Sequence, residues 1–204
     1  MKRLNGIVLA VVPTLFLTGC GDVSKNDVAK LSFDKLSVKE EQILNLTENR
    51  VFFYNIKDID KSNGYKIDLN YEFYKEGKEV RREPILSMIN ETYEDGKDDL
   101  DLGINIKEGN KINCLLSDDG VYTNNAYEFE ENIEDWATAV FSGDSELELA
   151  KGKRICIYYG TSENYIEAGA VGMDMDSEEV QKVINKNKEN IFLTISINDF
   201  ESEK

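Results

Sequence analysis

The 204-residue chain contains no histidine. Histidine supplies the base of most nucleophilic triads, many general bases and many zinc ligands. The sequence therefore excludes catalytic and metal sites that depend on an imidazole. It also lacks the Gly-x-Ser-x-Gly pattern that places the nucleophile of many hydrolases on a turn between a strand and a helix.

Basic residues are scarce relative to acidic ones. The chain has 24 lysines and arginines against 40 aspartates and glutamates, which gives a formal net charge of −16. A surface of this charge repels the phosphates of nucleic acids and of anionic lipids. We therefore expect no nucleic-acid partner, and the simplest role of the acid excess is solubility.

The apolar run near the N-terminus is short. It extends from Ile7 to Leu17 and is interrupted by Pro13, whereas a membrane-spanning helix needs roughly 20 apolar residues. Lys2 and Arg3 precede this run, and small residues follow it. This order of features is typical of a secretory signal.

The end of this segment, Leu17-Thr18-Gly19-Cys20, resembles the lipobox of bacterial lipoproteins. The resemblance covers only this segment. It implies that residues 1–19 are a removable signal peptide, that Cys20 carries the lipid, and that the protein is held at the extracytoplasmic face of the cell membrane. Several acyl chains anchor a protein firmly, because each buried methylene contributes about 0.8 kcal/mol. The alternative is an ordinary signal followed by an unrelated cysteine.

The rest of the chain divides into a tether and a folded part. Residues 20–30 are mostly polar and have no apolar period, which predicts a tether between the lipid and the fold. Residues 31–204 are enough for one domain of ordinary size. We expect a single β-rich domain there.

Only two further cysteines, Cys114 and Cys156, are present. An exported pair often forms a disulfide, but the local patterns oppose one here. Cys114 alternates in phase with its apolar neighbours, whereas Cys156 lies on the face opposite Ile155 and Ile157. We predict two free thiols, with Cys114 acting as a small core residue.

Apolar residues recur with a period of two along most of the chain. Val51–Ile56 and Ile155–Tyr159 are rich in β-forming residues on both faces and predict central strands. Tyr65–Phe73 alternates most regularly and predicts a strand with one face inward and one face in water. Further strands are predicted in five other runs: Leu31 and Phe33; Leu100, Leu102, Ile104 and Ile106; Ile112, Cys114 and Leu116; Tyr122 to Phe129; and Ile191 to Ile197.

Turn residues connect these strands. Lys75-Glu76-Gly77-Lys78 predicts a hairpin, and Pro84 restricts the strand that follows to a sheet edge or an irregular stretch. Lys151-Gly152-Lys153 predicts a second tight turn.

Three segments have helical features. Ser37–Glu40 fits a capping box, but the apolar run after it is brief, so we predict a strand from about Glu41 to Leu46. At 133–141 the apolar spacing favours a helix, whereas the turn at Gly143-Asp144 favours a hairpin into Leu147 and Leu149. We prefer the hairpin. Ser177–Ile184 predicts a capped helix whose charges match its dipole.

Many short strands with one late helix indicate a mainly β fold. The expected architecture is an antiparallel β-sandwich or open barrel with one short C-terminal helix.

One loop has the spacing of a calcium site. Asp58, Asp60, Ser62 and Gly64 place oxygen ligands at alternate positions, as in calcium loops. The pattern departs from an EF-hand, because the glycine is one place late and Leu69 occupies the position of the bidentate glutamate. A plain polar turn is the preferred interpretation, and we expect neither a metal nor a cofactor.

No motif names a reaction. The sequence favours a non-catalytic binding or interaction module at the cell envelope, with an envelope protein or glycan as its partner. One alternative is a solute-binding component of a transporter, although such proteins usually show βαβ alternation and this chain does not. The other is an envelope hydrolase that uses two carboxylates, and a cleft containing a carboxyl group of raised pKa would support it.

Overall fold

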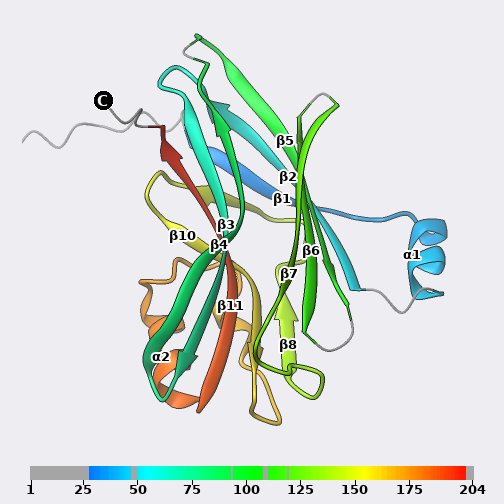
Figure 1. Cartoon of the computed structure of the whole chain (residues 1–204), viewed down its shortest axis with the longest axis vertical. Coiled ribbons are helices and arrows are strands. Elements are labelled where there is room, and N and C mark those ends of the chain that lie inside the picture. The colour runs from blue at the N-terminus through cyan, green and yellow to red at the C-terminus, as the bar shows by residue number, and fades with distance from the viewer. Residues whose placement is uncertain (1–27, 47–49, 93, 108–109, 119, 201–204) are drawn as a thin grey trace, which may run out of the picture.

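The computed structural model describes residues 28–46, 50–92, 94–107, 110–118 and 120–200, and in it two antiparallel sheets face each other (Figure 1). This is a β-sandwich, the first of the two predicted architectures. The signal peptide, Cys20 and most of the predicted tether lie outside the described residues. The first strand begins at Ala29, two residues before the predicted start of the folded domain.

The first sheet has six strands in the order β7-β6-β5-β2-β1-β9. Their bounds are β1 Ala29–Asp34, β2 Arg50–Asp60, β5 Lys97–Ile106, β6 Lys111–Asp118, β7 Val121–Glu128 and β9 Glu146–Leu149. The second sheet has five strands in the order β4-β3-β11-β10-β8. Their bounds are β3 Tyr65–Lys75, β4 Lys78–Asn90, β8 Ala137–Val140, β10 Arg154–Thr161 and β11 Glu189–Asp199.

The main core lies between the sheets. Leu102 and Ile56 of the first sheet and Leu69 and Ile195 of the second are fully buried there. These residues come from the alternating segments, because every second side chain of a strand points to the same face. The predicted strands around these residues are therefore confirmed.

A second layer of packing covers part of the outer face of the five-stranded sheet. The short helix η1 Ala168–Ala170 and the helix α2 Glu178–Lys186 pack there against Tyr159 and Phe192 (Figure 1). The Ser177 side chain accepts a hydrogen bond from the N–H of Val180, which confirms the predicted cap of α2.

The prediction that β3 has one face in water is wrong. Nearly every residue of β3 is buried, including the polar Asp68, Asn70 and Glu72. The outward side chains of β3 are enclosed by partners from distant segments, such as Ser87 of β4 and Arg154 of β10. Polar alternation therefore located the strand but not the environment of its second face.

The strand predicted from Glu41 to Leu46 is also wrong, because the segment forms the helix α1 Val38–Asn45. The Ser37 side chain accepts from the N–H of Glu40 at 3.4 Å, and the Ser37 N–H donates to the Glu40 carboxylate at 2.8 Å. This complete capping box satisfies two amide groups at the helix start. The helix projects from the sandwich, and Ile43 is exposed (Figure 1). The brief apolar run of this segment therefore does not mark a core strand.

Strands rather than a helix follow Ile133, as preferred, but they do not form a hairpin. The strand β8 pairs with β10 in the second sheet, and β9 pairs with β1 in the first. The Gly143-Asp144 turn therefore carries the chain from one sheet to the other. Just before this segment, the Asn132 side chain accepts a hydrogen bond from the N–H of Glu134 in a local turn.

The β3–β4 hairpin is confirmed. Glu76 and Gly77 have φ values of 50° and 77°, the left-handed conformation that a tight two-residue hairpin requires at both positions. Pro84 lies in β4, which is an edge strand as expected.

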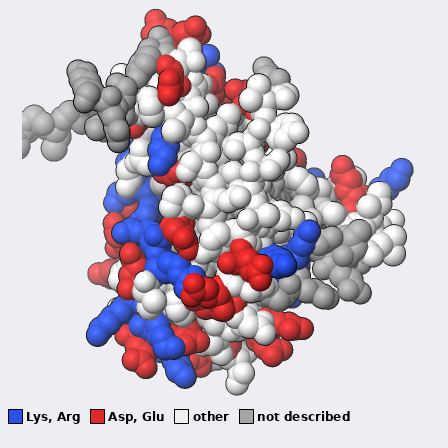
Figure 2. Space-filling view, viewed as in Figure 1, with Lys and Arg blue, Asp and Glu red and all other residues white. Residues whose placement is uncertain are grey.

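The edge strands β4 and β7 form a seam between the two sheets. The Asn125 amide donates to the Ile85 carbonyl at 2.6 Å, and the Tyr127 hydroxyl donates to Glu83. Side-chain hydrogen bonds thus join this side of the sandwich. Figure 2 shows charged groups of both signs gathered in the lower half of this side of the molecule, and a mostly uncharged surface above them.

Both predicted free thiols are confirmed. Cys114 lies in the core between the sheets, and Cys156 lies beneath α2, so different layers bury the two side chains. Burial raises the pKa of Cys114 to about 12 and also raises that of Cys156. Both are therefore thiols rather than reactive thiolates at neutral pH.

Candidate functional site

The residues of the calcium-like loop lie at the end of β2 and each has a local partner. Asp58 sits in a bulge with φ of 61°, and its carboxylate accepts from the Lys97 ammonium at 3.1 Å. The Asp60 carboxylate accepts from the Ser62 N–H at 3.0 Å, which lowers the pKa of Asp60, and it lies 3.8 Å from Lys151. Lysine counter-ions and a turn hydrogen bond therefore account for these carboxylates.

The acidic residues before α2 are held in the same way. Asp174 accepts from the N–H of Asp176 at 3.1 Å and pairs with Lys153 at 2.8 Å. In the part of the chain that the structure describes, no group of three or more cysteine, aspartate or glutamate side chains is placed to hold a metal ion.

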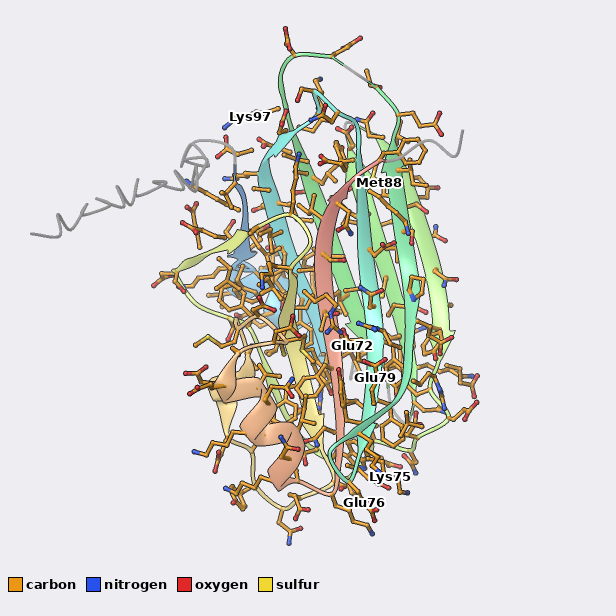
Figure 3. All side chains as sticks on the ribbon, turned by 90° about the vertical axis from the view of Figure 1, so that its left-hand side faces the viewer. Glu72, Lys75, Glu76, Glu79, Met88 and Lys97 are labelled. Carbon is orange, nitrogen blue, oxygen red and sulfur yellow. The ribbon has the colours of Figure 1, made fainter. Side chains whose placement is uncertain are left out.

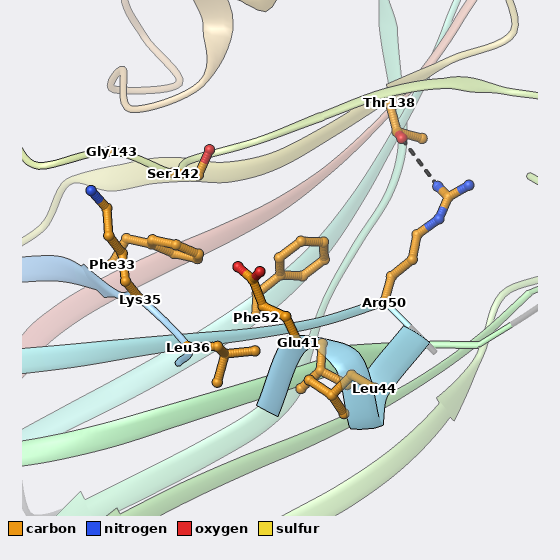
Figure 4. A pocket seen from close by; sticks show the side chains of 11 residues that line it. Phe33, Lys35, Leu36, Glu41, Leu44, Arg50, Phe52, Thr138, Ser142 and Gly143 are labelled. Atoms are coloured by element: carbon orange, nitrogen blue, oxygen red, sulfur yellow. Dashed lines mark hydrogen bonds between the residues drawn. The ribbon is translucent and has the colours of Figure 1, made fainter. Parts of the chain in front are cut away.

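A groove opens between the two sheets beside α1 (Figure 4). It has a volume of about 770 Å³, within the range typical of small-molecule sites. Residues from β1, the β1–α1 connection, α1, β2, β8 and the turn after β8 line it: Phe33, Lys35, Leu36, Glu41, Leu44, Arg50, Val51, Phe52, Thr138, Ser142 and Gly143.

The apolar wall of the groove comes from the inward faces of β1 and β2. Phe33 packs edge-on against Tyr54, with ring centroids 5.7 Å apart, and Phe52 lies two residues before Tyr54 on the same face of β2. Both phenylalanines remain partly exposed to the groove. Leu36 and Leu44 continue this wall from the side of α1 (Figure 4).

The polar end of the groove is formed by Arg50 and Thr138. The Arg50 guanidinium donates to the Thr138 hydroxyl at 3.3 Å (Figure 4). The other described arginines, Arg81, Arg82 and Arg154, each pair with at least one carboxylate. No carboxylate of the described residues lies within ion-pair distance of Arg50, so within this part of the chain the exposed guanidinium has no counter-ion.

A buried hydroxyl lies next to this arginine. Tyr158 of β10 is 3% exposed, and its oxygen has no hydrogen-bond partner of good geometry among the described residues. Burial raises the pKa of Tyr158 to about 12, while the Arg50 charge and the Thr138 hydroxyl oppose part of that rise. The tyrosine is therefore neutral and buried, and it does not line the groove.

Comparison of the chain with models of known protein families, with curated proteins and with solved structures found no match. Among the residues described, no helix is long and apolar enough to span a membrane.

The groove combines an apolar wall with an anion-attracting end, an arrangement suited to binding. The carboxyl groups whose pKa is clearly displaced are Glu40, Asp60, Glu167 and Asp174, and in all four the pKa is lowered. A general acid needs the opposite shift.

No local pattern in the sequence predicts this groove. Its residues come from segments up to about a hundred positions apart, and no motif links Phe33, Arg50 and Thr138. The one usable clue was the capping box at Ser37–Glu40, since α1 forms one side of the groove.

Proposed function

We propose that the protein is a lipid-anchored binding module of the cell envelope and that the groove beside α1 is its binding site. The resemblance of Leu17-Thr18-Gly19-Cys20 to a lipobox supports the anchor and the extracytoplasmic location. The observation that carries the binding role is the uncompensated Arg50 at the end of an apolar groove.

An anionic partner would form charge-assisted hydrogen bonds with a guanidinium that lacks a counter-ion. An apolar part of the ligand would remove Phe33 and Phe52 from water, which also favours binding. A ligand that contacts both would use the whole groove.

No observation favours the other functions weighed from the sequence. A solute-binding component of a transporter usually has two α/β lobes, whereas the described residues form two facing β-sheets. A carboxylate-based hydrolase would need a cleft with a carboxyl group of raised pKa, and the clearly displaced carboxyl pKa values are lowered.

The anchor is tested by replacing Cys20 with serine. We expect the protein to leave the membrane fraction or to accumulate uncleaved, because a serine oxygen cannot form the thioether that carries the lipid. Membrane fractionation and intact-protein mass spectrometry measure both outcomes. The matched control is Cys114→Ala, which should remain in the membrane fraction. A protein from native membranes with the mass of the bare polypeptide would refute the anchor.

The groove is tested in whole cells with a photoreactive amino acid in place of Leu36, which lines it. Irradiation should produce a mass adduct on the peptide that contains position 36. The same amino acid in place of Tyr122, an exposed residue of β7 on the first sheet, is the control. Equal labelling at the two positions would argue against the groove as the binding site.

A further inference from the structure

We propose that the groove binds an amphiphilic monoanion, with a carboxylate or phosphate-diester head at Arg50 and an apolar chain along Phe33 and Phe52. This inference rests on the proposed function, because it names the ligand class of the same groove.

The head group is inferred from the state of Arg50. Of the four arginines in the described residues, it alone lacks a carboxylate partner there, and its guanidinium donates to the Thr138 hydroxyl. The planar guanidinium presents donors in a fork that matches the two oxygens of a carboxylate or a phosphate. Arg50 is therefore free to accept such a group.

One hydroxyl reinforces this end of the groove. The Thr138 side chain lines the groove, and its oxygen accepts from Arg50. A hydroxyl can donate while it accepts, so Thr138 can turn its O–H toward an anionic oxygen bound at Arg50.

The other charges of the groove indicate a single negative charge. Lys35 is already paired with Asp144, so it is not a second free cation. Glu41 also lines the groove and would repel a second anionic group. Figure 4 shows the Arg50 guanidinium turned toward Thr138 and away from Glu41, so the head site and the acid are separated.

The chain is inferred from the apolar wall. Phe33, Phe52 and Leu36 provide the apolar surface of the groove, and the Glu41 carboxylate is drawn between the two phenylalanine side chains, on the side away from Arg50 (Figure 4). An apolar segment attached to the head group would cover this surface, and the removal of apolar surface from water would favour binding.

The test uses the full chain with Cys20→Ser, so that no attached lipid competes, and titration calorimetry with defined probes. Decanoate and decyl methyl phosphate, a phosphate diester, each carry the chain and a singly charged anionic head. Decanol has the chain with a neutral head, and decyltrimethylammonium has the chain with a cationic head. Acetate has an anionic head without the chain. We expect the two anionic amphiphiles to bind most tightly, and the tighter of them identifies the head group.

Variants locate the contact. Arg50→Gln should weaken decanoate binding roughly 10-fold to 100-fold, the cost of losing a charge-assisted hydrogen bond, and should leave decanol unchanged. Phe52→Ala should weaken every ligand that has the chain. Arg82→Gln, on the edge strand β4 of the other sheet, is the matched control and should not change any affinity. Circular dichroism of each variant verifies that it is folded.

The outcomes separate the two proposals. If decanol and decyltrimethylammonium bind as tightly as decanoate, and Phe52→Ala weakens all three, the anionic head is refuted while the groove remains a binding site. If decanoate binds to the Arg50→Gln variant as tightly as it binds to the parent chain, the inference is refuted. It is also refuted if no probe binds. The photolabelling at position 36 then decides the proposed function independently.

Discussion

Replacing Glu72 with alanine should lower the free energy of unfolding by about 3–5 kcal/mol, the typical cost of removing one partner of a buried ion pair. The Glu72 side chain is 0% exposed. It accepts hydrogen bonds from Arg154 at 2.5 Å, from the Thr194 hydroxyl at 2.7 Å and from the Tyr74 hydroxyl at 2.9 Å. The stick view of this side of the molecule places Glu72 near the middle of the sheet (Figure 3).

The loss is large because Glu72→Ala removes the shared acceptor of three donors. Tyr74 keeps Glu79 at 3.3 Å and Arg154 keeps Asp176 at 3.7 Å, both longer contacts than those lost. The Arg154 side chain is only 22% exposed, so water restores its solvation incompletely. Urea unfolding monitored by tryptophan fluorescence measures the change. The control is Glu128→Ala, which removes an exposed partner of Lys111 at 3.5 Å and should cost at most about 1 kcal/mol. Equal effects of the two substitutions would contradict this account.

Replacing Tyr71 with alanine should cost about 3–5 kcal/mol for a different reason, the cavity left by a large buried ring. The Tyr71 ring stacks on Phe129 with centroids 4.7 Å apart and contacts Tyr127 at 5.6 Å. The Arg81 guanidinium carbon lies 5.9 Å from the centre of the same ring. Alanine at position 71 would remove the shared member of these contacts.

Tyr71→Phe separates the ring from its hydroxyl, which donates to Glu131. We expect a loss of only about 1 kcal/mol, because Glu131 keeps the Arg81 guanidinium at 3.3 Å as a partner. Tyr122→Ala, at an exposed tyrosine, should stay within about 0.5 kcal/mol of the parent chain. Thermal unfolding of the three variants provides the comparison. A cost of Tyr71→Phe close to that of Tyr71→Ala would show that the hydroxyl, not the ring, dominates.

Much of the strand structure was predictable from the sequence because alternation is a local property. The segment from Leu100 to Ile106 places every second residue in the core, and the strand β5 follows that pattern. The hairpin at Glu76-Gly77 was predictable for the same reason, since two neighbouring residues determine the turn.

The environment of a strand's second face was not predictable. Glu72 belongs to a polar series that normally indicates solvent, yet its partner Arg154 lies 82 positions away in the sequence. The groove was not predictable for the same reason, because Arg50 and Thr138 are hydrogen-bonded although they lie 88 positions apart in the sequence. The misassigned helix α1 differs, because its capping box was visible locally and outweighs a brief apolar run.

The edge strands of the two sheets affect whether neighbouring copies of the protein aggregate when they are close together. An unpaired edge strand can recruit a strand of another molecule and begin aggregation. On the β4 edge Pro84 offers no amide hydrogen, and Arg81 and Arg82 bring charge close to it. On the opposite edges, β8 and β9 are only four residues long. Natural sheets use these features to avoid pairing edge to edge. Copies of this protein held close together on a surface would therefore not join into one β-sheet.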